Sequence, residues 1–400
     1  MSLFGSAIRS DFPALSDELV LLDAPGGTQM PAVVAERIAQ TATSAISNRS
    51  RGSLPGRNAD DAVLEFRAAA ADLFGADPAG IVHGRSATQL TFDFSRALAK
   101  QWAEGDNIVL SGLDHDCNVA PWLLAAECAG VEVRWARIDP DTSELPVGQY
   151  ERLVDARTRL VAVGAASNLI GTQPNIAAIS AIAHAVGALT YVDGVHYTAH
   201  VPVDVRALGA DFFIASSYKL FGPHFGMLAA APELLEQIHP DKLRPSPESV
   251  PERFELGTLP YEALAGATAA IDYVASLADE GESRRERIVS AMRAMDEYEL
   301  ELRGVIERGL AELPGVTGYS RAESRTSTLL VTVDGFTPIE VEARLRDSGL
   351  IAQAGHFYAI EPCTDLGLGA EGGVRFGLAP YNTLAEAERL VAAMREIVGA

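Results

Sequence analysis

A regular alternation of strand-like and helix-like patterns constrains the fold of this chain more than any other feature. Short apolar runs that are typical of buried strands lie at residues 80–84, 106–112, 131–139, 158–167, 188–194 and 211–217. Amphipathic patterns separate most of these runs, and one predicted helix begins after Ser86, a residue type that favours the N-cap position. Strands that alternate with helices predict a mostly parallel sheet covered on both faces. We therefore expect an α/β fold.

The pattern changes after about residue 265. A long helical stretch covers residues 282–313, and shorter strand and helix patterns follow it towards the C-terminus. These patterns predict a small α+β unit over residues 266–400, which follows a large ligand-binding domain over residues 21–265. We expect residues 1–20 to form an N-terminal segment that packs with the small unit.

Charge and cysteine content limit the classes of function. Acidic residues outnumber basic ones by 54 to 32, and the resulting charge of −22 repels nucleic acids and anionic membranes. The three cysteines include no CxxC pair, so we expect neither a disulfide framework nor a metal site, and a reducing cytoplasm is the natural compartment. The N-terminus lacks the apolar core of a signal peptide, and no apolar run approaches ~20 residues. We expect a soluble cytoplasmic protein that acts on a small molecule.

Polar side chains gather where the predicted strands end. Ligands of open parallel sheets bind beyond the C-terminal ends of the strands. Five of the predicted strands are followed there by groups able to bind or react, which include Arg85 and Ser86, His115, Asn168, Asp193 and His196, and Ser216 to Lys219. These side chains predict a site at one edge of the sheet.

Lys219 differs from the other lysines of the chain. There are three lysines, and Lys100 and Lys242 lie in segments that should be solvated, whereas Lys219 follows a buried apolar strand. A buried lysine is costly as a structural element. Partial burial lowers the pKa of a lysine and leaves a nucleophilic amine, which is what a Schiff-base lysine for pyridoxal 5′-phosphate (PLP) requires.

Two further features suit PLP. Asp193 ends the strand before the lysine strand, where a carboxylate is able to hold the pyridine nitrogen protonated. Residues 84–88 open a helix whose N-terminus suits a phosphate group. Both features also have structural interpretations, because Asp-Gly is a common turn and Gly-plus-Ser often begins a helix.

Seven motifs carry a resemblance to a known family. They lie at residues 22–29, 114–122, 166–172, 191–196, 216–226, 253–258 and 374–383. With these motifs the chain, from Leu21 to near its C-terminus, resembles fold-type I PLP enzymes of the class V aminotransferase and cysteine desulfurase group. The resemblance implies a large domain with a seven-stranded sheet, a small C-terminal domain, a PLP cofactor, an amino-acid substrate and a homodimer with shared active sites.

The resemblance also implies roles for individual residues. Lys219 matches the PLP lysine, Asp193 the partner of the pyridine nitrogen, and His115 the histidine that stacks on the ring. Asn168 and His196 match positions beside the phenolic oxygen, although desulfurases usually carry glutamine in place of His196. The residues that match positions around the phosphate and its surroundings are Arg85, Ser86, Ser216, Tyr218 (commonly histidine in desulfurases) and, from the other subunit, Gly257 and Thr258. Arg375 matches the arginine that binds the substrate carboxylate, a task that suits its fork of N–H groups.

One departure from the family pattern bears on the reaction. Desulfurases carry a nucleophilic cysteine in the segment that here reads Gln353 to Ala359, and Tyr358 stands in its place beside His356, which we expect near the substrate. Cys363 is five residues further on, and Cys117 is interpreted as packing at a helix start.

The missing cysteine decides which reaction we favour. We expect a C–S β-lyase that acts on a cysteine S-conjugate, with Lys219, His115 and Tyr358 as catalytic groups. The alternatives are an aminotransferase or decarboxylation-coupled oxidative deamination, an amino-acid epimerase, a desulfurase with a displaced cysteine, and a non-catalytic PLP-fold protein.

Overall fold

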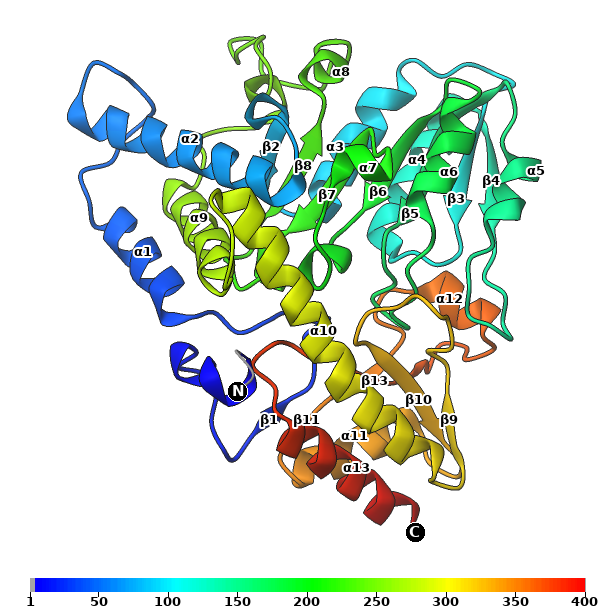
Figure 1. The fold of residues 1–400 in the computed structure, drawn as a ribbon. Helices are drawn as coiled ribbons and strands as arrows, with labels where there is room; N and C mark the ends of the chain where they lie inside the picture. The colour runs from blue at the N-terminus through cyan, green and yellow to red at the C-terminus, as the bar shows by residue number, and fades with distance from the viewer. Residues whose placement is uncertain (1–3, 400) are drawn as a thin grey trace.

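The six predicted strands and one further strand form a seven-stranded sheet in the computed structural model, which describes residues 4–399 (Figure 1). In spatial order the strands are β2 (Ile81–Gly84), β8 (Gly226–Ala230), β7 (Phe212–Ser216), β6 (Leu189–Asp193), β5 (Thr158–Gly164), β3 (Asn107–Ser111) and β4 (Glu132–Ala136). Strands β7, β6, β5, β3 and β4 pair in parallel, and β8 is antiparallel to both β7 and β2. The mostly parallel α/β sheet is therefore confirmed.

Helices cover both faces of this sheet. The helices of this part of the chain are α1 (Ala32–Ala42), α2 (Leu54–Phe74), α3 (Ala87–Ala99), α4 (Ala120–Ala129), α5 (Tyr150–Leu153), α6 (Ile176–His184), α7 (Val205–Leu208), α8 (Pro232–Glu236) and α9 (Tyr261–Ser276). Successive strand residues point to opposite faces. Phe212 thus joins the apolar cluster that includes α3 and α4, whereas Phe213 joins the cluster that includes α2, α6 and α9.

Strand β8 was not predicted. It follows β7 after a short loop that contains Lys219, without an intervening helix, so the helix–strand alternation gives no signal for it. Its first residue, Gly226, lies so close to α3 that an added Cβ would stand 2.3 Å from the carbonyl carbon of Ser86. A glycine is therefore needed where β8 brings the lysine loop against the start of α3.

The C-terminal part forms a second, smaller unit. Its four-stranded antiparallel sheet has the order β12 (Gln353–Gly355), β13 (Gly373–Phe376), β10 (Leu329–Val333) and β9 (Val316–Gly318), and β1 (Val20–Leu21) pairs with β11 (Leu350–Ile351). The helices of this unit are α10 (Arg284–Ala311), α11 (Pro338–Asp347), α12 (Ile360–Asp365) and α13 (Leu384–Val398).

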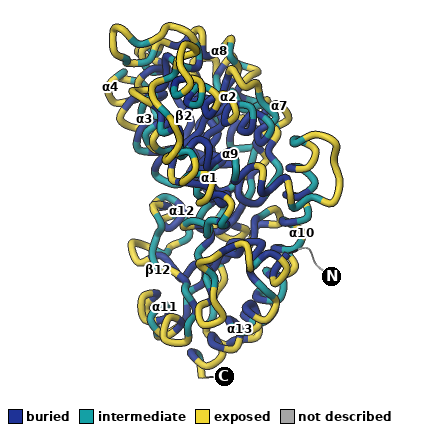
Figure 2. The backbone as a smooth tube through the Cα atoms, turned by 90° about the vertical axis from the view of Figure 1, so that its left-hand side faces the viewer, coloured by how far each residue is buried: buried dark blue, intermediate teal, exposed yellow. Residues whose placement is uncertain are grey.

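Helix α10 connects the two units. It runs from beside α9 to α13, and the small unit has an apolar cluster of its own (Figure 1). Figure 2 shows buried backbone gathered inside the larger unit, with exposed segments outside it. Residue 265 lies within α9, and the division at this residue stays a prediction. Of the N-terminal segment, residues 1–3 lie outside the described residues, and Arg9 forms an ion pair of 2.8 Å with Glu386 of α13.

Candidate active site

The C-terminal ends of the strands surround a small cavity of about 110 Å³. Eight residues that the sequence singled out line it: Ser86, His115, Asn168, Asp193, His196, Ser216, Tyr218 and Lys219. Thr88, which belongs to the predicted phosphate-binding helix start, also lines it, as do Asp114 and Cys117, for which no role in a site was predicted. The parallel strands thus bring together side chains that are spread over more than 130 positions of the chain, from Ser86 to Lys219.

Lys219 is buried in this cavity. It ends a short 3-10 turn directly after β7 and is 7% exposed, and its amine donates to the carbonyl oxygen of Pro25. Burial, together with the positive charge of Arg375, lowers the pKa of Lys219 to about 8. By contrast, Lys100 and Lys242 form ion pairs of 2.7 Å with Asp241 and Glu248. Lys219 is therefore the lysine of the chain that is suited to act as a nucleophile.

Asp193 is held at the end of β6, between β5 and β7. Its Oδ1 accepts a hydrogen bond from the backbone N–H of Val195 at 2.8 Å, and its Oδ2 accepts one from the thiol of Cys117 at 3.3 Å. Burial raises the pKa of Asp193. The contact with Val195 is the turn-forming role expected of Asp-Gly, and the same carboxyl group also lines the cavity.

His115 lines the cavity as a neutral imidazole. Its Nδ1 accepts a hydrogen bond from the backbone N–H of Cys117 at 3.0 Å, so the proton of the neutral ring is on Nε2. Burial lowers the pKa of His115 to about 4, with further contributions from the positive charges of Lys219 and Arg375. A neutral ring is suited to stack on a flat cofactor.

Asp114, next to His115, is a second buried carboxyl group. It accepts hydrogen bonds from the backbone N–H of Gly164 at 2.7 Å and from the side chain of Asn118 at 2.6 Å. Burial, together with the negative charge of Asp193, raises the pKa of Asp114 to about 8. The strand-end position of Asp114 was the sequence signal for this residue.

Two buried polar atoms of the cavity lack a partner. His196 bonds through Nε2 to the hydroxyl groups of Thr326 at 3.1 Å and Thr328 at 3.0 Å, and its Nδ1 has no partner within residues 4–399. Asn168 donates from Nδ2 to the carbonyl oxygen of Phe357 at 3.0 Å, and its Oδ1 has none in that part of the chain. Buried polar groups normally have partners, so these atoms fit a polar ligand such as PLP.

The start of α3 forms another wall of the cavity. Ser86 caps this helix, because its hydroxyl group accepts a hydrogen bond from the backbone N–H of Gln89 at 3.0 Å. Ala87, Thr88 and Ser216 lie beside it. The first N–H groups of a helix have no acceptor within the helix, and together with hydroxyl groups they suit a phosphate.

Arg375 lies on β13 and is 3% exposed. Its guanidinium group donates to the carboxylate of Asp23 at 2.6 Å and to the carbonyl oxygen of Asn168 at 3.0 Å. The aromatic ring of Phe357 covers the group at 3.8 Å, while Nε lacks a partner in the described residues. The buried position near Lys219 suits a role in binding a carboxylate.

Segment 355–358, whose aromatic rings lie next to Arg375 and His115, is held in a strained conformation. Phe357 and Tyr358 both have left-handed backbone angles, with φ of 53° and 58°. The backbone N–H of Asp116 donates to the carbonyl oxygen of Tyr358 at 2.8 Å, and the N–H of Tyr358 donates to Nδ1 of His356 at 3.1 Å. Such strain costs about 1–3 kcal/mol per residue and is common at functional sites.

Several predicted residues lie outside the inner cavity. His356 and Tyr358 line an outer cavity of about 670 Å³, and the ring of Tyr358, which is 66% exposed, lies 5.4 Å from that of His115. Arg85, Gly257 and Thr258 are exposed and do not line the inner cavity. The predicted contribution of Gly257 and Thr258 to a second subunit stays a prediction.

Cys363 lies in α12, away from the lining of either cavity. It is 1% exposed and belongs to the large apolar cluster. Burial raises the pKa of the Cys363 thiol to about 11, which makes it a poor nucleophile at neutral pH.

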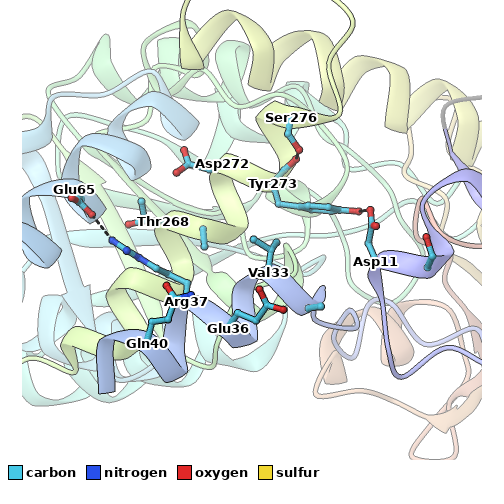
Figure 3. A pocket seen from close by; sticks show the side chains of 13 residues that line it. Asp11, Val33, Glu36, Arg37, Gln40, Glu65, Thr268, Asp272, Tyr273 and Ser276 are labelled. Atoms are coloured by element: carbon cyan, nitrogen blue, oxygen red, sulfur yellow. Dashed lines mark hydrogen bonds and ion pairs between the residues drawn. The ribbon is translucent and has the colours of Figure 1, made fainter. Parts of the chain in front are cut away.

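A larger groove of about 710 Å³ lies elsewhere, between α1, α9 and the N-terminal segment (Figure 3). Arg37 pairs there with Glu65 at 3.0 Å, and the hydroxyl group of Tyr273 donates to Asp11 at 2.9 Å. The groove contains no lysine. Its volume exceeds that of the inner cavity, but its groups offer no comparable chemistry.

No group of three or more His, Cys, Asp or Glu side chains within residues 4–399 is arranged to hold a metal ion. No helix in the same range is long and apolar enough to span a bilayer.

A buried lysine, a buried carboxyl group and a helix N-terminus surround one cavity at the edge of the α/β sheet, and this arrangement fits PLP. The sequence profile described as aminotransferase class-V matches residues 20–390, and the chain belongs to this family. It is a PLP-dependent enzyme with the fold-type I architecture.

Individual relatives agree with this assignment. An uncharacterized protein of Mycobacterium tuberculosis is 33% identical over 98% of both chains. A probable cysteine desulfurase of Mycolicibacterium paratuberculosis is also 33% identical, over 98% of this chain and 58% of the relative. The crystal structure of the cysteine desulfurase CsdA of Escherichia coli is similar with a TM-score of 0.87, at 27% identity over 98% of both chains.

Proposed function

We propose that this enzyme is a C–S β-lyase that releases a thiol from a cysteine S-conjugate. The observation that supports the proposal best is the position of the three thiols. The thiol of Cys117 forms a hydrogen bond with Asp193, Cys128 is exposed on α4, and Cys363 is buried in α12. Tyr358 occupies the segment in which a desulfurase carries its cysteine. A lyase needs no protein thiol.

The proposed roles follow from the surroundings of each group. PLP withdraws electrons from the α-carbon of a bound amino acid. Lys219 Nζ, with its lowered pKa, would remove the α-proton of the substrate, and the carboxylate of Asp193, which lines the same cavity, would hold the pyridine nitrogen of PLP. Arg375 binds the substrate carboxylate, and the phenol of Tyr358 donates a proton to the departing sulfur.

The bonds of the reaction balance without an oxidant. The C–H bond at the α-carbon and the C–S bond at the β-carbon break, the thiol leaves with a proton, and hydrolysis of the released enamine gives pyruvate and ammonia. We infer an amino-acid substrate because the buried guanidinium group of Arg375, which suits a carboxylate, lies near the buried amine of Lys219.

A substrate screen tests this proposal. Amino acids and cysteine S-conjugates are incubated with the holoenzyme and assayed for pyruvate, ammonia, free thiol, sulfide and racemised amino acid. We expect stoichiometric pyruvate and thiol from a conjugate, and none with the Lys219→Ala variant. Sulfide from cysteine together with a protein persulfide would instead show a desulfurase, racemisation an epimerase, and a keto acid that retains the side chain an aminotransferase.

A further inference from the structure

The thiol of Cys117 points at the carboxylate of Asp193. Cys117 is 9% exposed and lines the inner cavity, and its Sγ lies 3.3 Å from Asp193 Oδ2. From the sequence alone, this cysteine is expected to pack at a helix start. The hydrogen bond gives it a place beside a group of the active site.

We propose that Cys117 is a positioning residue, whose thiol donates a hydrogen bond to Asp193 Oδ2 and thereby fixes the orientation and basicity of this carboxylate towards the pyridine nitrogen. The inference rests on the role proposed for Asp193. It adds to that role a group that determines how strongly the carboxylate holds the proton of the cofactor.

The two oxygen atoms of Asp193 are bound differently. Oδ1 accepts from the backbone N–H of Val195 at 2.8 Å, and this donor is fixed by the chain itself. Within residues 4–399, the thiol of Cys117 is the one group that hydrogen bonds to Oδ2. The side chain at position 117 therefore sets the remaining interaction of the carboxylate.

Cys117 is itself held in place and protonated. Its backbone N–H donates to His115 Nδ1 at 3.0 Å, so the turn that carries it also holds His115. Burial raises the pKa of the Cys117 thiol well above its ordinary value, and the negative charge of Asp193 raises it further. The sulfur thus keeps its proton and acts as a weak donor rather than as a nucleophile.

Substitutions that change only the donor test this inference. Cys117→Ala removes the hydrogen bond, Cys117→Ser supplies a stronger donor, and Cys128→Ala removes an exposed thiol on α4 as a control. Each variant is reconstituted with PLP that carries ¹⁵N in the ring. The ¹⁵N resonance reports the protonation of the pyridine nitrogen. As a second readout, a pH titration of the cofactor absorbance gives the pH at which the absorbance change is half complete, which is called the absorbance midpoint.

We expect the two substitutions at position 117 to act in opposite directions. Cys117→Ala makes the carboxylate more basic, so the ring nitrogen holds its proton more strongly, whereas Cys117→Ser has the reverse effect. The absorbance midpoint should move by about half a pH unit in each case. Cys128→Ala should behave as the wild type.

Wild-type resonances in both Cys117 variants, or shifts in the same direction, would overturn the inference and leave Cys117 with a packing role only. If Cys117→Ala does not fold, Cys117→Ser alone decides by the direction of its shift. Failure of the underlying assignment is distinguishable, because Asp193→Asn would then leave the ¹⁵N resonance unchanged.

Discussion

Burial changes the chemistry of Lys219. Its pKa falls from an ordinary value of 10.5 to about 8. The amine is protonated below this value and is a neutral nucleophile above it.

The rate at which PLP attaches covalently to the apoprotein should therefore rise with pH, with a midpoint near 8, because only the neutral amine attacks an aldehyde. Stopped-flow absorbance measures this rate. Arg375→Gln should move the midpoint upwards, because removal of a nearby positive charge favours the protonated amine. A midpoint close to 10.5 in the wild type would show that Lys219 is solvated.

At Arg375 the expected effect is on substrate binding. Arg375→Ala should raise KM for an amino-acid substrate, because loss of a buried charge-assisted pair costs about 2–4 kcal/mol, or roughly 30- to 1000-fold. Steady-state kinetics test this. An amine that corresponds to the substrate but lacks the carboxylate is the matched control, and its binding should change little. Equal effects on both ligands would indicate that Arg375 only stabilises the contact between β13, Asp23 and Asn168.

Among the structural elements, we expect segment 353–359 to determine which reaction follows. Its two left-handed residues and its hydrogen bonds to Asp116 and Asn168 hold Tyr358 at the outer cavity, near His115. Cys363 lies on the following helix with a pKa raised to about 11.

Cys363→Ala should keep full turnover on the natural substrate, whereas Tyr358→Phe should reduce turnover, because the phenol is the proton donor that we propose for the departing sulfur. General acids contribute about 10²- to 10⁴-fold. Steady-state rates and trapping of a protein persulfide are the measurements. An inactive Cys363→Ala variant together with a persulfide on Cys363 would replace the lyase by a desulfurase with a displaced cysteine.

The elements of the large sheet were predictable where the sequence pattern is local. Ser86 caps α3, as the pattern indicated, and Gly75 ends α2 in the left-handed conformation that glycine favours. Strand β8 was not predictable in this way, because its pairing with β2 and β7 is non-local and no helix separates it from β7.

The residues of the site were also predictable only where the sequence signal is local. The strand-end rule identified Lys219, Asp193 and His115, since each follows an apolar run. The bonds of His196 to Thr326 and Thr328 join residues about 130 positions apart, and no pattern at either position indicates them. The thiol contact of Cys117 was missed for the same reason.

For the whole molecule, we expect a homodimer in which both subunits contribute to each site. Leu256, Gly257 and Thr258 form an exposed loop outside the inner cavity of their own chain, and the resemblance places the last two at the phosphate of a partner. A two-fold interface is the commonest arrangement for such enzymes.

Subunit mixing tests the shared site. Lys219→Ala and Thr258→Asp subunits should each be nearly inactive alone, and random reassociation should restore about a quarter of the wild-type sites, because half of the dimers then hold one intact site. Light scattering measures the oligomeric state in parallel. A stable, active monomer, or no recovery in verified heterodimers, would contradict the shared-site arrangement.

We propose that Lys219 holds PLP at the edge of the sheet. Reduction of the holoenzyme with borohydride, followed by peptide mapping, tests this directly. We predict one pyridoxyl adduct, on the peptide that contains Lys219, and loss of this adduct in Lys219→Ala while Lys100 and Lys242 stay unmodified. An adduct on Lys100 or Lys242 in the wild type, or none on Lys219 in cofactor-saturated protein, would show that Lys219 is not the residue that holds PLP.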